Sequence, residues 1–273
     1  MAIGRYLGVD LAWREDDDRQ AANESGVAVL DDGGRVLDAG WTRGSAGTLN
    51  WIREATDDDP ALLFVDAPLV VTNPAGQRLC ETQVGQRYGR WKVSANTTNL
   101  NSPRLAGVTL RGRLEACGWT YADGHDGPPA AGRVVSECYP YTTLVGASEL
   151  GYDRERPRYK RKPKGMPVSA WRPRRAVACD ELIRRLDGLA AADPPLRLDS
   201  HPITRRLTEE PSPQDDRAYK HREDLIDALM CAWTAALWAR HGSARCQVLG
   251  PAPTGGDRPA ATIIAPARPE QRR

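Results

Sequence analysis

Apolar runs alternate with turn-forming residues along the first half of the chain, in the order strand, strand, strand, helix, strand. The runs at 4–13, 27–30 and 35–41 are separated by stretches rich in Gly, Asp and Asn, which predicts three antiparallel strands. Helical spacing over 48–55 and a continuous apolar run at 61–65 follow. Because a strand, a helix and a strand in succession usually form a right-handed crossover, we expect 61–65 to lie parallel to 4–13.

The second half of the chain is richer in helical patterns than in strand patterns. An amphipathic pattern over 174–191 predicts a surface helix, and a pattern that is apolar on nearly all sides over 221–240 predicts a buried one. The remaining expected elements are helices at 74–88 and 104–117, a strand at 133–136 and a mostly irregular stretch at 193–219.

These patterns predict one α/β domain over residues 1–249. The expected insertions lie at about 72–130 and 151–173, and we find no internal repeat. Residues 250–273 form a tail rich in Pro, Ala and Arg, in which only 261–265 has the pattern of a strand.

The composition narrows the class of protein. The 273 residues are 40% hydrophobic and 27% charged, as in an ordinary globular chain. No secretory signal is recognisable, and the longest apolar stretch is shorter than the ~20 residues of a membrane span. The six cysteines form no C-x-x-C pair and have no zinc-ligand spacing with the histidines. We therefore expect a cytoplasmic protein with reduced thiols, without a zinc site and without a membrane partner.

The net charge of +2 hides a strongly basic segment. Residues 154–175 contain ten Lys and Arg against one acid, a local charge of +9, so the rest of the chain carries about −7. A basic segment on an acidic body is a candidate contact for nucleic acid, although a solvated loop would have the same composition. The candidate phosphate contacts are Arg158, Lys160, Arg161, Lys162 and Lys164.

Acidic residues recur within or directly after the apolar elements. Asp10 lies inside the first apolar run, while Asp66 and Glu137 each follow a later run. Asp224 and Asp227 are three residues apart on the last helix and share a face. The apolar part of these elements contains no Lys or Arg, so we expect the acids to lack cationic partners there.

Several unpaired carboxylates in one place would repel one another and raise each other's pKa. A divalent ion removes this conflict, and oxygen ligands suit Mg²⁺ or Mn²⁺. The alternative is that each acid caps a helix or a turn. Two ions about 4 Å apart could activate water and stabilise the leaving oxygen of a phosphodiester. Asp10 would then bridge two ions, Asp66 and Glu137 would hold one each, and Asp227 or Asp224 would complete the shell.

Short motifs along nearly the whole chain resemble the family catalogued as domain of unknown function 429, described as predicted ribonuclease-H-like nucleases. The motifs are Gly8-Val9-Asp10-Leu11-Ala12-Trp13, Val65-Asp66-Ala67-Pro68-Leu69, Arg78-x-Cys80-Glu81, Glu137-Cys138-Tyr139-Pro140 and Asp227-Ala228-Leu229. The last helix also resembles the final acidic helix of Holliday-junction resolvases.

This resemblance implies a ribonuclease-H-like fold, with a five-stranded mixed sheet flanked by helices and carrying a helical insertion. Three antiparallel strands would be followed by parallel ones. It also implies a metal-dependent nuclease, a hydrolase acting on DNA or RNA, with Asp10, Asp66, Glu137 and Asp227 as catalytic residues. The family supplies no established substrate.

Two other functions remain open from the sequence. A phosphotransferase of the actin and sugar-kinase type needs a Gly-rich phosphate cradle after the first Asp, and Leu11, Ala12 and Trp13 fill that turn with bulk. A non-catalytic nucleic-acid-binding module that retains the fold would have the same carboxylates without using a metal.

Overall fold

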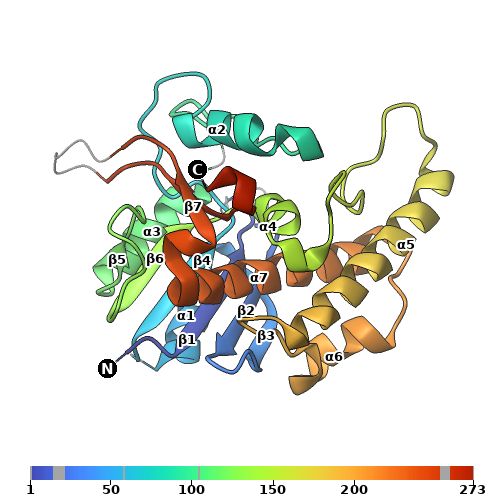
Figure 1. The fold of residues 1–273 in the computed structure, drawn as a ribbon, viewed down its shortest axis with the longest axis horizontal. Helices are drawn as coiled ribbons and strands as arrows, with labels where there is room; N and C mark the ends of the chain where they lie inside the picture. The colour runs from blue at the N-terminus through green and yellow to red at the C-terminus, as the bar shows by residue number, and fades with distance from the viewer. Residues whose placement is uncertain (1, 15–21, 58, 104, 253–258, 273) are drawn as a thin grey trace.

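A six-stranded mixed sheet forms the centre of the protein, with strand order β3-β2-β1-β4-β6-β5 (Figure 1). The computed structural model describes all residues except 1, 15–21, 58, 104, 253–258 and 273. The strands are β1 (Arg5–Asp10), β2 (Glu24–Asp31), β3 (Val36–Arg43), β4 (Ala61–Val65), β5 (Thr120–Tyr121) and β6 (Arg133–Glu137).

The antiparallel part of the sheet comes first in the chain and the parallel part follows. β1 pairs with β2 and β2 with β3 in antiparallel register, whereas β1–β4, β4–β6 and β6–β5 are parallel. This confirms the α/β class, the mixed sheet and the predicted neighbourhood of β1 and β4. The predicted count of five strands is wrong, because β5 is only two residues long and has no sequence pattern of its own.

Helices cover both faces of the sheet, and the alternation of side chains along the strands explains why. Leu7 and Val9 of β1 lie in one apolar cluster with residues of α1 (Gly44–Thr56) and α3 (Ala106–Ala116). Tyr6 and the β4 residue Phe64 belong to the opposite cluster, which includes α7 (Asp216–His241). Since successive side chains point to opposite faces, a strand covered on both sides is apolar throughout.

Helix α7 crosses β1, β2 and β4 and is buried along most of its 26 residues (Figure 1). This confirms the predicted buried helix. Gly8 on β1 allows its close approach, because a Cβ there would lie 2.0 Å from the carbonyl oxygen of Ala228. Gly26 on β2 does the same for Asp224, whose carbonyl oxygen would lie 2.1 Å from an added Cβ.

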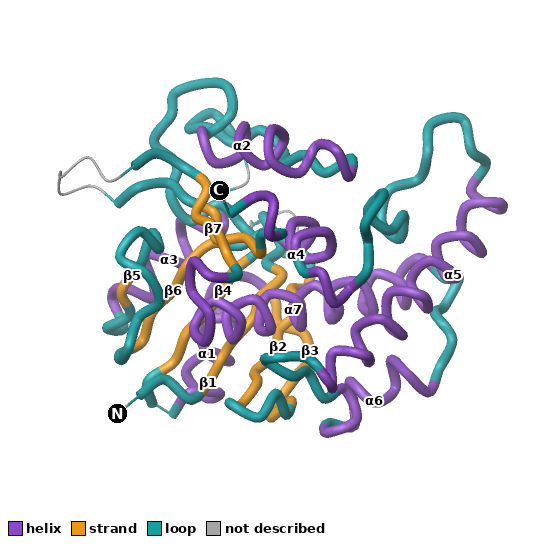
Figure 2. The backbone as a smooth tube through the Cα atoms, in the orientation of Figure 1, coloured by secondary structure: helices purple, strands orange, loops and turns teal. Residues whose placement is uncertain are grey.

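Smaller elements surround this core. They are α2 (Leu79–Tyr88), α4 (Pro140–Gly146), α5 (Val168–Asp187), α6 (Pro202–Glu209) and six 3₁₀ turns: Gly89–Trp91, Ser148–Leu150, Gly188–Ala191, Leu198–Ser200, Gly242–Ala244 and Pro269–Gln271. Helices α5 and α6 pack together beside α7 (Figure 2). Helix α5 begins at Val168 instead of Arg174, and α6 lies within 193–219, which we expected to be mostly irregular.

A second, two-stranded antiparallel sheet joins β7 (Cys246–Leu249) to β8 (Ile263–Pro266). Strand β8 overlaps the only strand expected in the C-terminal tail, at 261–265, and it is buried along its length. Strand β7 was not predicted. No helix in the described part of the chain is long and apolar enough to cross a membrane.

Candidate metal centre

Three carboxylates meet at one edge of the sheet. Asp10, Asp66 and Asp227 each offer an oxygen, and these oxygens lie within 4.8 Å of one another. Asp227 is fully buried, and the other two are partly buried. Three of the acids singled out from the sequence are thus brought together from β1, from the residue after β4, and from α7.

The parallel pairing of β1 and β4 places the first two acids. Asp10 is the last residue of β1, and Asp66 directly follows β4. The backbone N–H of Asp66 donates to the carbonyl oxygen of Val9 over 2.8 Å, which continues the ladder by one step. Carboxyl ends of adjacent parallel strands lie at the same edge, so both side chains reach the same region.

The close packing of α7 on β1 brings the third acid. The helix backbone at Ala228 lies against Gly8, two residues before Asp10 on the strand. Asp227, the neighbour of Ala228, therefore reaches the same edge as Asp10. Asp224, one helical turn earlier, lies close enough to Asp10 for a side-chain hydrogen bond.

The donor set fits a hard divalent cation. All three ligand atoms are carboxylate oxygens, which Mg²⁺ and Mn²⁺ prefer, and no soft or nitrogen ligand accompanies them in the group. Burial and then the charge of Asp10 raise the pKa of Asp66 to about 8, with Lys160 and Lys220 opposing the rise. Burial and Asp10 likewise raise the pKa of Asp224 to about 8. A cation at this place would relieve the repulsion between the carboxylates. These residues can therefore hold a metal ion.

The acids of α7 have cationic partners, which corrects the expectation that they would lack them. The Lys160 ammonium forms an ion pair with Asp227, and the Tyr159 hydroxyl donates to the same carboxylate over 2.7 Å. Lys220, one helical turn before Asp224, forms an ion pair with it. Burial lowers the pKa of Lys220, but the charges of Asp10, Glu223 and Asp224 raise it further, so the net change is upward.

Glu137 lies outside the three-carboxylate group, in a separate buried network. Arg78 donates to both of its carboxylate oxygens over 2.8 and 2.7 Å, and the N–H of Leu69 donates over 3.0 Å. Its oxygens accept from Arg78 and Leu69 in this structure, and its role as a metal ligand stays a prediction. Burial raises the pKa of Glu137, and Arg78 opposes that rise.

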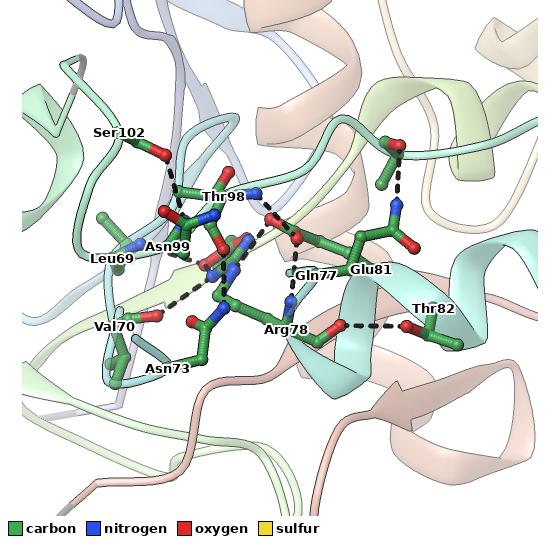
Figure 3. A network of polar contacts seen from close by, with 12 residues as sticks. Leu69, Val70, Asn73, Gln77, Arg78, Glu81, Thr82, Thr98, Asn99 and Ser102 are labelled. Atoms are coloured by element: carbon green, nitrogen blue, oxygen red, sulfur yellow. Dashed lines mark hydrogen bonds and ion pairs between the residues drawn. The ribbon is translucent and has the colours of Figure 1, made fainter. Parts of the chain in front are cut away.

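Arg78 is the centre of this network (Figure 3). Besides Glu137, its guanidinium donates to Glu81 over 2.9 Å and to the carbonyl oxygen of Val70 over 3.1 Å. Glu81 in turn accepts from the N–H of Thr98 over 3.0 Å. The network therefore ties the loop after Asp66 to the start of α2 and to the polar loop at 94–102. It lines a small pocket beside the carboxylates, together with Trp13, Asp66 and Tyr139.

One residue of the basic segment lies at the carboxylate centre, and the other candidate phosphate contacts lie on the surface. Lys160 lies at the centre, with 17% of its side chain exposed. The other candidate phosphate contacts are exposed: Arg158, Arg161, Lys162 and Lys164. Among these, Arg158 pairs with Glu155, Arg161 donates to Asn96 over 2.9 Å, and Lys162 donates to the carbonyl oxygen of Met166 over 2.7 Å.

Arg78, Tyr159 and Lys220 belong to the site and were not predicted as site residues. Only Lys220 had a clear local signal, because a Lys four residues before Asp224 on a helix faces it. Arg78 had a weaker one, as part of the motif with Glu81. Tyr159 had none, since its contact with Asp227 joins residues 68 positions apart.

The raised pKa values predict that the metal-free protein loses stability as the pH rises from about 3.8, the ordinary value, to about 8. Between these values the folded state keeps protons that the unfolded chain has released. The free energy of unfolding then falls with pH, by at most about 1.4 kcal/mol per pH unit for each group. Denaturant midpoints measured across this range in the presence of a chelator check the expectation.

Asp66→Asn should reduce this slope, because the amide has no proton to lose. Asp199→Asn, at an exposed carboxylate of the Leu198–Ser200 turn, is the matched control and should keep the wild-type slope. A stability that rises with pH over the interval, or an unchanged slope in Asp66→Asn, would contradict the assigned protonation.

Comparison with known proteins places this centre within one family. Neither the curated proteins nor the solved structures compared with the chain include a significant match. A family model described as "Protein of unknown function (DUF429)" matches residues 8–252, a span that contains Asp10, Asp66 and Asp227. Because this match covers most of the 273 residues, the chain belongs to the DUF429 family of proteins of unknown function.

Proposed function

We propose that the protein is a metal-dependent nuclease that hydrolyses phosphodiester bonds of nucleic acid. The observation that carries the proposal is the convergence of Asp10, Asp66 and Asp227, whose oxygens lie within 4.8 Å of one another. Such a set, with two of its acids at the carboxyl ends of parallel strands and the third on α7, suits a divalent ion that binds a phosphate oxygen. The finer fold proposal is ribonuclease-H-like, supported by three antiparallel strands followed by parallel ones and by acids on β1, after β4 and on the last long helix.

Each residue of the centre would have a distinct role in the proposed nuclease. Asp10 and Asp66 would hold Mg²⁺ or Mn²⁺, and Asp227 would complete the carboxylate side of the centre. The ion, when bound, supplies an activated water and neutralises charge on the phosphate. Arg78 and Glu137 would fix the loop that follows Asp66, since they bind Val70 and Leu69 of that loop.

The exposed part of the basic segment would bind the phosphate backbone. Arg158, Arg161, Lys162 and Lys164 lie on a chain segment that also delivers Lys160 to the centre. Phosphate contacts made by such side chains are independent of sequence and weaken with salt. The proposed partner is therefore nucleic acid, bound chiefly through its backbone.

Cleavage of a panel of single-stranded, duplex and branched DNA and RNA with Mg²⁺ or Mn²⁺ tests the proposal. We expect cleavage of at least one substrate, abolished by a chelator. Asp10→Asn should lower the rate at least about 100-fold, the scale of loss when an electrostatic group at the reacting atoms is removed. Asp199→Asn, the exposed control, should cleave at the wild-type rate.

Two results would contradict the nuclease. One is wild-type cleavage by Asp10→Asn, and the other is no cleavage of any substrate by the purified wild-type protein. Binding of nucleic acid without cleavage, together with no binding of Mn²⁺, would favour the non-catalytic module, in which Lys160 and Lys220 alone neutralise the acids.

A further inference from the structure

The segment between α4 and α5 places two side chains against Asp227. The Tyr159 hydroxyl donates to one carboxylate oxygen over 2.7 Å, and the Lys160 ammonium pairs with the other. Asp227 and Tyr159 are both fully buried. Both oxygens of this predicted metal ligand are thus engaged by the chain itself.

Aromatic rings hold the Lys160 ammonium in place. Its nitrogen lies 5.2 Å from the ring centroid of Tyr141 and 5.4 Å from that of Tyr159, within the range of a cation–π contact. Tyr219 anchors the segment, because its hydroxyl donates to the carbonyl oxygen of Tyr159 over 2.5 Å. A carboxylate and two aromatic rings therefore surround a single cation, unlike the surroundings of an ordinary surface lysine.

Cations of the chain already neutralise part of the centre. Lys160 pairs with Asp227, and Lys220 pairs with Glu223 and Asp224. A second ion at Asp227 would lie beside the ammonium of Lys160, and like charges repel strongly in a poorly solvated site.

The two-ion site predicted from the sequence also used Glu137 as a ligand. Arg78 and Leu69 already engage its oxygens. Ion binding there would have to break a buried ion pair, which leaves Arg78 without one of its two carboxylate partners.

We propose that the ammonium of Lys160 takes the place of a second metal ion at the centre, so that the protein binds one divalent ion at Asp10 and Asp66. This rests on the proposed nuclease function. The fixed ammonium at Asp227 supplies the positive charge that a second ion would supply, and it stabilises negative charge on the phosphate during cleavage. Lys160 is then a residue of the reaction centre, distinct from the backbone-binding residues around it in the sequence.

Calorimetric titration with Mn²⁺ alone, without nucleic acid, measures the number of ions bound per chain and so tests the proposal. We expect one ion per chain for the wild-type protein and two for Lys160→Met, because the ammonium no longer excludes an ion from Asp227. Lys162→Met is the matched control, since Lys162 is exposed and donates to a backbone carbonyl, and this variant should bind one ion. Lys160→Arg keeps the charge and should also bind one.

The possible outcomes distinguish a failure of this inference from a failure of the proposed nuclease function. Two ions bound by the wild-type protein, or one ion bound by both wild type and Lys160→Met, would overturn the role of Lys160 and leave the nuclease standing. No Mn²⁺ bound by any variant would overturn the metal-dependent function and the inference with it. Lys160→Gln is titrated in parallel, and circular dichroism of each variant establishes that the titrated protein is folded.

Discussion

Arg78→Met is expected to destabilise the protein by about 3–5 kcal/mol, the range for removing one partner of a buried ion pair. The side chains of Arg78, Glu81 and Glu137 are each 3% exposed or less. Removing the guanidinium leaves two carboxylates in a place that water barely reaches. The loss therefore comes mainly from the unpaired charges left behind, and urea denaturation at neutral pH measures it.

An exposed pair of the same type is the control. Arg90 pairs with Glu270, and their side chains are 56% and 49% exposed. Arg90→Met should therefore cost less than about 1 kcal/mol, as for other solvated pairs. Equal losses in the two variants would show that burial does not set the energy of the Arg78 network.

A second substitution distinguishes the destabilisation caused by unpaired carboxylates from that caused by lost packing of the Arg78 side chain. Glu137→Gln in the Arg78→Met background removes one of the two unpaired carboxylates, so the double variant should be more stable than Arg78→Met alone. The two sites are in contact, so their energies should not add. Additive losses would mean that the two side chains act on stability independently, against the bidentate geometry.

The part of the fold that could be predicted from the sequence is the part with long, regular patterns. Strands β1 and β4 are continuous apolar runs joined by a helix, so their parallel pairing follows from local pattern and chain handedness. Strand β5 and helices α4 and α6 were missed because each is short. Elements of this size are held by tertiary contacts more than by their own propensity, and α4 is buried at every position.

The carboxylates were easier to predict than their partners. An acid at the end of an apolar run is visible in one segment, and Asp10 and Asp66 needed only the crossover to meet. The pairs Arg78–Glu137 and Lys160–Asp227 join residues far apart in the chain, and the first spans 59 positions. No periodicity encodes such contacts, so a site predicted as bare carboxylates includes three paired cations in the folded protein.

Gly8→Ala is expected to be among the most damaging substitutions in the chain, with a loss of more than about 3 kcal/mol, above the usual range for overpacking. An added Cβ would lie 2.0 Å from the carbonyl oxygen of Ala228 and 2.3 Å from the nitrogen of Ala232. Both are backbone atoms of α7, so no side chain can rotate away. The helix must shift, and Asp227 must move with it away from Asp10.

The expected result is a double loss, in stability and in Mn²⁺ binding, because forcing α7 and β1 apart also displaces Asp10, a ligand of the proposed ion. Gly112→Ala is the control, because Gly112 lies on the exposed face of α3 with nothing within 4 Å of an added Cβ. Alanine there should stabilise the protein by about 0.5–1 kcal/mol through its helix propensity. A Gly8→Ala protein of wild-type stability that binds Mn²⁺ normally would mean that α7 does not pack on β1 at this distance. If Gly8→Ala loses stability but binds Mn²⁺ with wild-type affinity, the contact between α7 and β1 is not needed to bring the carboxylates together.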